Sequence, residues 1–137
     1  MSGESYILNA KLRDGISLSS SEKELMLDID AVLNKLPIYK GYVMRDLFFI
    51  DADEMQKFTN QHYIGAVVDY PSFTSTTTLG SYQDNPEARL KILSQKGVDL
   101  RKYNQEEGEI LFSRNSKFKV IDIQIENNIK LYIMEEL

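Results

Sequence analysis

Two short runs of alternating residues near the C-terminus constrain the fold of this 137-residue chain more than any other feature. In residues 121–125 isoleucine alternates with polar residues, and in residues 129–133 isoleucine and leucine alternate in the same way. A period of two gives a strand one apolar face, and Asn127-Asn128 between the runs tolerates the positive φ angles of a two-residue turn. The sequence therefore predicts an antiparallel hairpin in this part of the chain.

The rest of the chain combines helical and strand patterns in one domain. Ser21 and Glu24 form the S-x-x-E pattern of a capping box ahead of apolar residues at helical spacing, which Pro37 ends. Residues 1–20 are polar and weakly patterned, so we expect an N-terminal arm or lead-in there and a single domain over residues 21–137. We expect a second helix over 51–64, a short helix or irregular segment from Asn85, and strands over 41–50, 66–68, 72–78, 91–94, 109–112, 118–125 and 129–134. The predicted fold class is α+β with mostly antiparallel pairing.

Residue types that the chain lacks narrow its chemistry. It has no cysteine, which excludes disulfides, thiolate nucleophiles and cysteine-ligated zinc. We expect its single histidine, His62, at the surface or at a helix end, with no catalytic role. The net charge of −5 disfavours a surface that coats nucleic acid, because neutralising phosphates needs basic residues. Catalysis would therefore depend on carboxylates, hydroxyls and arginines.

Arg45 stands in the middle of an apolar strand pattern, between Val43-Met44 and Leu47. A buried guanidinium without a partner is costly. It could pair with a carboxylate, lie on a wet face of the strand, or hold a phosphate through paired hydrogen bonds, for which its planar fork is suited.

Five consecutive hydroxyl residues, 74–78, follow Phe73. Threonine favours strands, so an exposed edge strand would explain the run. Alternatively, several of these hydroxyls converge on a polar ligand or brace a neighbouring carboxylate.

Glu107 and Glu109 lie two residues apart ahead of an apolar strand. In an extended backbone both would project to the same side. They are either part of a solvated acidic loop or a functional pair that suits acid–base chemistry and stabilises a developing cation.

In this order, the arginine, the hydroxyl run and the two glutamates resemble the R–S–E signature of the mono-ADP-ribosyltransferase family. The E-x-E form is similar to that of its arginine-modifying toxins and phage or polymorphic-toxin exoenzyme domains. The connecting segments from about Ser21 to the C-terminus are similar too. Met44 and Asp46 stand where the family has an aromatic residue and a glycine, and Thr77 where it has a second serine.

The resemblance implies an ADP-ribosyltransferase-like fold, in which two packed, mostly antiparallel sheets form an NAD cleft beside a short N-terminal helical segment. NAD would be the co-substrate, without a metal. The residues implied to bind NAD are Arg45, Ser75, Thr76, Thr77 and Glu109. At 137 residues the helical segment is short for the family, so we expect part of the wall of the NAD site to be missing.

The resemblance implies catalytic roles for Glu109, Glu107, Arg45 and Ser75. Glu109 would stabilise the oxocarbenium-like state as nicotinamide leaves, and Glu107 would orient and deprotonate the incoming guanidinium. Tyr103, in the loop before the glutamates, is the aromatic residue that we expect to contact the target protein, with Glu107 beside it.

The implied activity is transfer of ADP-ribose from NAD to a protein arginine, by a toxin or effector. Three alternatives stay open: a catalytically inactive module with the same fold, an NAD glycohydrolase, and an adaptor whose C-terminal hairpin pairs with a partner strand. Expected partners are a target protein and an immunity protein, and neither nucleic acid nor membrane. Neither a signal peptide nor an apolar run of about 20 residues is visible. We therefore expect a soluble protein that is cytoplasmic, or is delivered by a non-classical route or as part of a larger toxin.

Overall fold

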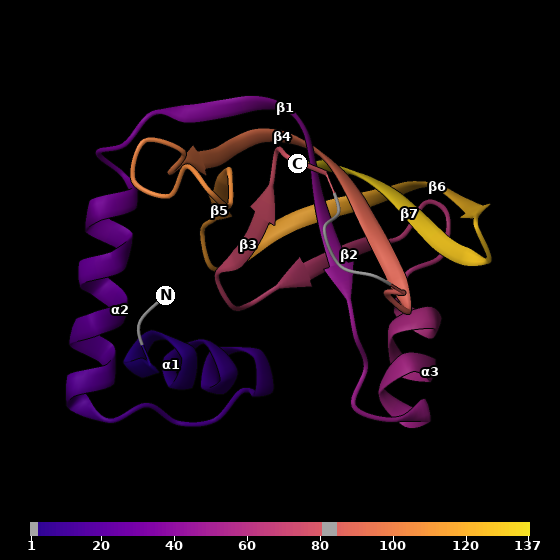
Figure 1. Ribbon diagram of the computed structural model, residues 1–137. Coiled ribbons are helices and arrows are strands. Elements are labelled where there is room, and N and C mark those ends of the chain that lie inside the picture. Colours follow the sequence, from indigo (N-terminus) through magenta and orange to yellow (C-terminus); the bar gives the residue numbers. More distant parts are fainter. Residues whose placement is uncertain (1–2, 81–84) are drawn as a thin grey trace.

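The computed structural model describes residues 3–80 and 85–137, which form three helices and seven strands (Figure 1). In chain order they are α1 (Gly3–Asp14), α2 (Ser20–Leu33), β1 (Ile38–Leu47), α3 (Ala52–Gln61), β2 (Val67–Tyr70), β3 (Thr74–Thr77), β4 (Ala88–Asp99), β5 (Glu109–Phe112), β6 (Ser116–Glu126) and β7 (Ile129–Glu136). Figure 1 shows α1 and α2 at one end of the sheet and α3 at the other. None of the helices in the described ranges has the length and apolar character needed to span a membrane.

Hydrogen bonds join the described strands into one sheet of order β1-β3-β5-β4-β7-β6-β2. In addition β1 pairs with β4, so β1, β3, β5 and β4 close into a ring. Among the described pairings only that of β4 with β7 is parallel, which confirms the mostly antiparallel α+β class. The resemblance implies two packed sheets, whereas in this structure the described strands form one continuous sheet. The long strand β4 makes the sheet continuous, because it pairs with β1 along one edge and with β7 and then β5 along the other.

The predicted C-terminal hairpin is confirmed. Asn127 and Asn128 have φ angles of 52° and 65°, as a type I′ turn requires. Both strands of the hairpin are already paired inside the sheet, β7 with β4 and the first part of β6 with β2. Pairing with a partner strand, as the adaptor alternative needs, would therefore be limited to the outer part of β6.

Helix α2 begins two residues earlier than the sequence pattern indicates. Its capping box is Ser19 with Glu22, since the Ser19 side chain accepts from the Glu22 N–H and the Glu22 carboxylate accepts from the Ser19 N–H. Lys11 of α1 donates to the same carboxylate at 2.9 Å and so ties the two helices together. The Ser19 N–H and the Lys11 ammonium lower the pKa of Glu22 to about 2.

The expectation of a loosely attached N-terminal arm is wrong for residues 3–14, which form α1. Leu8 is fully buried, and the Asn9 side chain forms two hydrogen bonds with the backbone of Phe73 just before β3. The Asn9 Nδ2 donates to the Phe73 carbonyl at 2.8 Å, and the Phe73 N–H donates to the Asn9 Oδ1 at 2.7 Å. An amide that pairs with a strand leaves no periodic apolar signal, so the sequence pattern missed this anchor.

The strand predicted over residues 91–94 is the middle of the much longer β4. Asn85, which has a φ angle of 57°, opens no helix, and β4 starts three residues later at Ala88. The larger core cluster lies between this strand, β1, β5, β6 and β7 and includes Val43, Leu90 and Phe118. A smaller cluster, centred on Leu33 and Phe73, packs α2 against β3, β4 and β5.

Candidate active site

Arg45 lies on β1, partly buried, and its Nη1 donates to the carbonyl oxygen of Ser75 at 2.7 Å. Burial lowers the pKa of the Arg45 guanidinium below its usual value, although the nearby Tyr70 and Tyr6 side chains act in the opposite direction. Within residues 5–80 and 85–137 Arg45 takes part in no ion pair, so the carboxylate partner left open by the sequence is not found there. A desolvated guanidinium without a carboxylate partner in these ranges is suited to bind an anion.

Asp46, next to Arg45, lies on the opposite face of β1 because side chains alternate along a strand. It is paired across the sheet with Arg89 of β4, and the Arg89 Nε lies 2.8 Å from the Asp46 Oδ1. Asp46 stands where the family has a glycine, but the charge of its carboxylate is neutralised by the ion pair with Arg89. Asp46 should therefore not repel an anion bound at Arg45.

Ser75 connects the arginine to one of the two glutamates. Its carbonyl accepts from Arg45, and its Oγ donates to the Glu109 Oε2 at 2.5 Å. Thr77 stands directly opposite Glu109 in the β3–β5 register, on the same face as Ser75. Three of the residues predicted from the sequence, Arg45, Ser75 and Glu109, are thus linked in one row across β1, β3 and β5.

Thr76 does not belong to this row, contrary to its predicted place among the NAD-binding residues. It is only 5% exposed and points to the opposite face of β3. Its Oγ1 donates to the carbonyl of Ile110 at 2.8 Å. The alternation along a strand puts Ser75 and Thr77 on the site and turns Thr76 toward the core.

Glu107 lies on a turn, so the expectation that both glutamates project from one extended strand is wrong. Gly108 has a φ angle of 56°, and β5 begins only at Glu109. A Cβ on Gly108 would come within 2.7 Å of the Leu79 side chain and 2.8 Å of the Thr78 Oγ1, so glycine is needed there on both counts. Glu109 is 8% exposed, whereas Glu107 is exposed.

The two carboxylates meet at a residue that the sequence did not single out. The Asn104 Nδ2 donates to the Glu107 Oε2 at 2.9 Å and reaches the Glu109 Oε1 at 3.4 Å. Thr77 adds a further bond, from its Oγ1 to the Glu107 carbonyl, at 2.6 Å. An asparagine in a polar loop gives no pattern, so only the folded loop reveals this contact.

Tyr103 lies beside Asn104 in the loop between β4 and β5, and its side chain is 68% exposed. The backbone N–H groups of both residues donate to the carbonyl of Leu100, which makes the loop compact. A hollow of about 590 Å³ is lined by Pro37, Asp99, Arg101, Lys102, Tyr103 and Gln105. Tyr103 is therefore accessible to a partner next to the two glutamates.

His62 ends α3, as expected, but it is buried rather than at the surface, with 3% exposure. Its Nδ1 lies 2.8 Å from the Phe58 carbonyl and its Nε2 2.7 Å from the Tyr70 hydroxyl. A carbonyl only accepts, so Nδ1 carries the proton and Nε2 accepts from Tyr70. Burial lowers the pKa of His62 and raises that of Tyr70.

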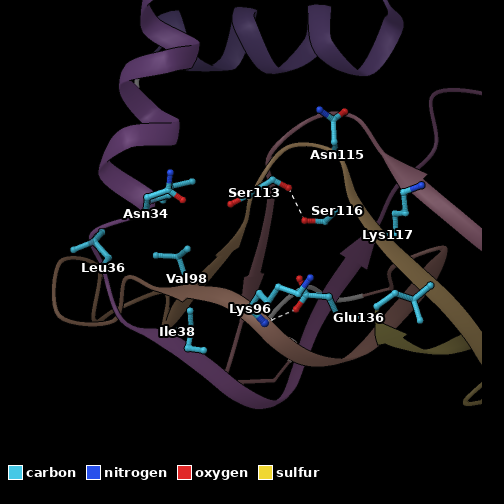
Figure 2. A pocket seen from close by; sticks show the side chains of 12 residues that line it. Asn34, Leu36, Ile38, Lys96, Val98, Ser113, Asn115, Ser116, Lys117 and Glu136 are labelled. Atoms are coloured by element: carbon cyan, nitrogen blue, oxygen red, sulfur yellow. Dashed lines mark hydrogen bonds between the residues drawn. The ribbon is translucent and has the colours of Figure 1, made fainter.

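A second hollow, of about 650 Å³, lies where the end of α2 meets the start of β1, the start of β6 and the end of β7 (Figure 2). Leu36, Ile38 and Val98 form an apolar side, and Ser113, Ser116 and Lys117 form part of a polar one. The carboxylate of Glu136 there accepts the backbone N–H groups of Gln95 and Lys96, so it belongs to the framework. None of the residues lining this hollow belongs to the row from Arg45 to Glu109. The described residues also hold no group of three or more His, Asp or Glu side chains that could bind a metal ion.

Comparison with known proteins identifies the family. No protein-family model matches the chain. A Mycobacterium avium (strain 104) protein, Mav, named as an NAD(+)–arginine ADP-ribosyltransferase, is 32% identical to it over 120 residues, or 83% of this chain. The chain belongs to the ADP-ribosyltransferase family. This ADP-ribosyltransferase chain spans only 14% of the length of Mav.

Solved structures confirm the ADP-ribosyltransferase fold. The catalytic domain of VsdC from Aeromonas hydrophila superposes with a TM-score of 0.75 at 20% identity, over 96% of this chain and 92% of that domain. Vis, an ADP-ribosyltransferase from Vibrio splendidus solved with agmatine, superposes with a TM-score of 0.73 at 23% identity, over 98% of this chain and 69% of Vis. The alignment with VsdC shows that the chain has the ADP-ribosyltransferase fold over nearly its whole length.

Proposed function

We propose that this chain transfers ADP-ribose from NAD to an arginine of a target protein. The observation that carries the proposal is the row of Arg45, Ser75 and Glu109, with Glu107 held beside Glu109, in a chain of the ADP-ribosyltransferase family. The name of Mav supports NAD and arginine as substrates. The complex of Vis with agmatine, a small guanidinium compound, supports an arginine-like acceptor. The single catalytic domain predicted over residues 21–137 remains a prediction, to which we add α1.

Arg45 is the residue that we assign to the pyrophosphate of NAD. One of its N–H groups is used by the Ser75 carbonyl, and the guanidinium has further donors for phosphate oxygens. The hydroxyls of Ser75 and Thr77, which share one face of β3, would add polar groups for the nicotinamide end.

Glu109 is the residue that we assign to the bond-breaking step. The bond between C1′ of the ribose and the nicotinamide nitrogen breaks, and its electron pair leaves with neutral nicotinamide. The ribose then carries a developing positive charge, which an ionised carboxylate stabilises. The Ser75 hydroxyl fixes one oxygen of Glu109 and so holds the carboxylate in one orientation.

Glu107 is the residue that we assign to the acceptor. A nitrogen of the target guanidinium attacks C1′, and one proton must leave this nitrogen as the new bond forms. Glu107, exposed and close to Glu109, can bind the guanidinium and take up that proton. Tyr103, which directly precedes Asn104 on the same loop, would contact the surface around the target arginine.

The test is incubation of the purified chain with labelled NAD and a cell lysate, followed by mapping of the modified residue by mass spectrometry. We expect labelled arginine, loss of both labelling and nicotinamide release in Glu109→Ala, and loss of labelling with much of the release retained in Glu107→Ala. Glu106→Ala, a neighbouring exposed glutamate, is the matched control and should stay active. Full activity of Glu109→Ala would refute the site.

Two other outcomes correspond to the alternatives. Nicotinamide release without protein labelling in any lysate fraction would make the chain an NAD glycohydrolase. Absence of NAD binding in a calorimetric titration would make it an inactive module with this fold.

A further inference from the structure

One side-chain amide bridges the two glutamates of the site. The Nδ2 of Asn104 carries two hydrogens, and the Glu107 Oε2 and the Glu109 Oε1 lie 2.9 Å and 3.4 Å from it. The other oxygen of Glu109 accepts from Ser75. Each oxygen of the buried Glu109 carboxylate therefore faces a neutral donor, one on β3 and one in the loop.

The position of Asn104 is fixed by the backbone of its own loop. Its N–H donates to the Leu100 carbonyl at 2.9 Å, and its carbonyl accepts from the Gly108 N–H at 3.1 Å. The Leu100 N–H in turn donates to the Glu109 carbonyl at 3.0 Å. The loop from Leu100 to Glu109 is thus closed at its base, with the Asn104 amide directed at both carboxylates.

Two carboxylates that approach each other repel, and a neutral donor between them reduces that repulsion without pairing off either charge. A lysine or arginine in the same place would form an ion pair and compete with a guanidinium acceptor for Glu107. An amide binds both carboxylates without placing a positive charge between them. This is what a site needs when one carboxylate must face a ribose cation and the other a guanidinium.

We propose that Asn104 is a positioning residue that holds Glu107 and Glu109 in the orientation needed for NAD cleavage and arginine transfer. This inference rests on the proposed function. Tyr103 is exposed and directly precedes Asn104. A target protein bound at Tyr103 would therefore influence the orientation of the two glutamates through Asn104.

The test compares Asn104→Ala and Asn104→Asp with Gln105→Glu in steady-state nicotinamide release. Asn104→Asp keeps the shape of the side chain but replaces the donor by a third carboxylate. Gln105→Glu makes the same change of charge one residue further along the loop, on an exposed side chain. The melting temperature and the KM for NAD are measured for each variant.

We expect kcat to fall by roughly tenfold in Asn104→Ala and roughly a hundredfold in Asn104→Asp, since misplacement of a reacting group by about 1 Å costs about this much. The KM for NAD and the melting temperature should change little, and Gln105→Glu should stay within about twofold of the parent. An equal loss in Gln105→Glu would assign the effect to charge alone and overturn the proposal. A loss of kcat that follows the fraction of unfolded protein would also overturn it.

A second readout does not depend on turnover. In an NMR spectrum the side-chain NH₂ resonances of Asn104 should move in both Glu107→Gln and Glu109→Gln, and stay in place in Glu106→Gln. Unchanged resonances in the first two variants would refute the bridge even in an active enzyme. Absence of NAD cleavage by the parent chain, with the resonances responding, would instead refute the proposed function.

Discussion

Arg45 and Glu109 are bound to opposite ends of the same residue. The guanidinium of Arg45 bonds the carbonyl of Ser75, and the carboxylate of Glu109 accepts its hydroxyl at 2.5 Å. Ser75 therefore fixes the separation between the group that we assign to the pyrophosphate and the group that we assign to the ribose cation. The hydrogen bond from Arg45 to the Ser75 carbonyl does not depend on the Ser75 side chain, whereas the bond to Glu109 does. The two bonds can therefore be tested separately.

Removing the hydroxyl of Ser75 should disable the carboxylate without unfolding the chain. In Ser75→Ala one oxygen of the buried Glu109 loses its donor, and we expect a tenfold to hundredfold lower kcat for nicotinamide release, with a stability loss of about 1–2 kcal/mol. Ser75→Thr keeps a hydroxyl and should retain more activity. Thr76→Val, on the core side, should lower the unfolding free energy by about 1 kcal/mol with kcat unchanged. Equal kcat in Ser75→Ala and the parent would contradict this role.

Replacing Arg45 should weaken NAD binding. Arg45→Lys keeps the charge but loses the planar fork, and we expect the Kd for NAD to rise by about tenfold or more. Asp46→Asn is the matched control: it breaks the pair with Arg89 on the opposite face, and we expect it to cost about 1–3 kcal/mol of stability and to leave the Kd unchanged. Calorimetric titration with NAD and chemical denaturation measure the two effects. A larger Kd in Asp46→Asn than in Arg45→Lys would reverse the assignment.

Removing the side chain of Asn9 should loosen the attachment of α1 to the segment just before β3. Asn9→Ala removes both hydrogen bonds to Phe73, at a cost of about 1–3 kcal/mol. Hydrogen exchange of the Phe73 amide should accelerate, since its acceptor is lost. Asn60→Ala, on the exposed side of α3, serves as the control and should leave that exchange rate alone. Unchanged protection of Phe73 in Asn9→Ala would contradict the role of Asn9 as the anchor of α1.

The stability of the fold should fall in mildly acidic solution because of His62. Burial lowers the pKa of His62 in the folded chain below the value of about 6.5 expected when it is unfolded. The unfolded chain therefore binds the proton first, and the contribution of His62 is complete above about pH 6.5 and is lost as the pH falls through the folded pKa. Unfolding free energies measured from pH 8 to pH 5 should show this loss. His62→Gln should remove that part of the dependence, and an unchanged slope would exclude His62 as its source.

Much of the site was predictable because it depends on residue types and strand alternation. Arg45 in an apolar strand, a hydroxyl run and two glutamates are anomalous in composition, and resemblance to a family placed them together. The prediction took the hydroxyl run as one unit, although alternation along β3 turns Thr76 to the face opposite Ser75 and Thr77. The strand over residues 109–112 and the C-terminal hairpin follow from local patterns and were predicted correctly.

What could not be predicted depends on contacts between distant or irregular segments. Asn9 anchors α1 through an amide that meets Phe73, 64 positions away, and no local pattern reports this. Asn104 approaches the glutamates because Gly108 reverses the backbone between them. The residues that were expected to form a lead-in thus form α1, and the expectation that part of the wall of the NAD site is missing stays a prediction.

The ring of β1, β3, β5 and β4 determines when the site can exist during folding. Arg45, Ser75 and Glu109 come from three of its strands, and Arg45 lies 30 positions from Ser75 and Ser75 lies 34 from Glu109. Strand pairings between residues this far apart in the chain form slowly. The ring closes only when all four strands are paired in the correct register. A slip of one residue in any of these strands would turn its site residue to the wrong face. The groups that we assign to catalysis are therefore separated in any form in which one of these ladders has not yet formed, and such a form should not cleave NAD.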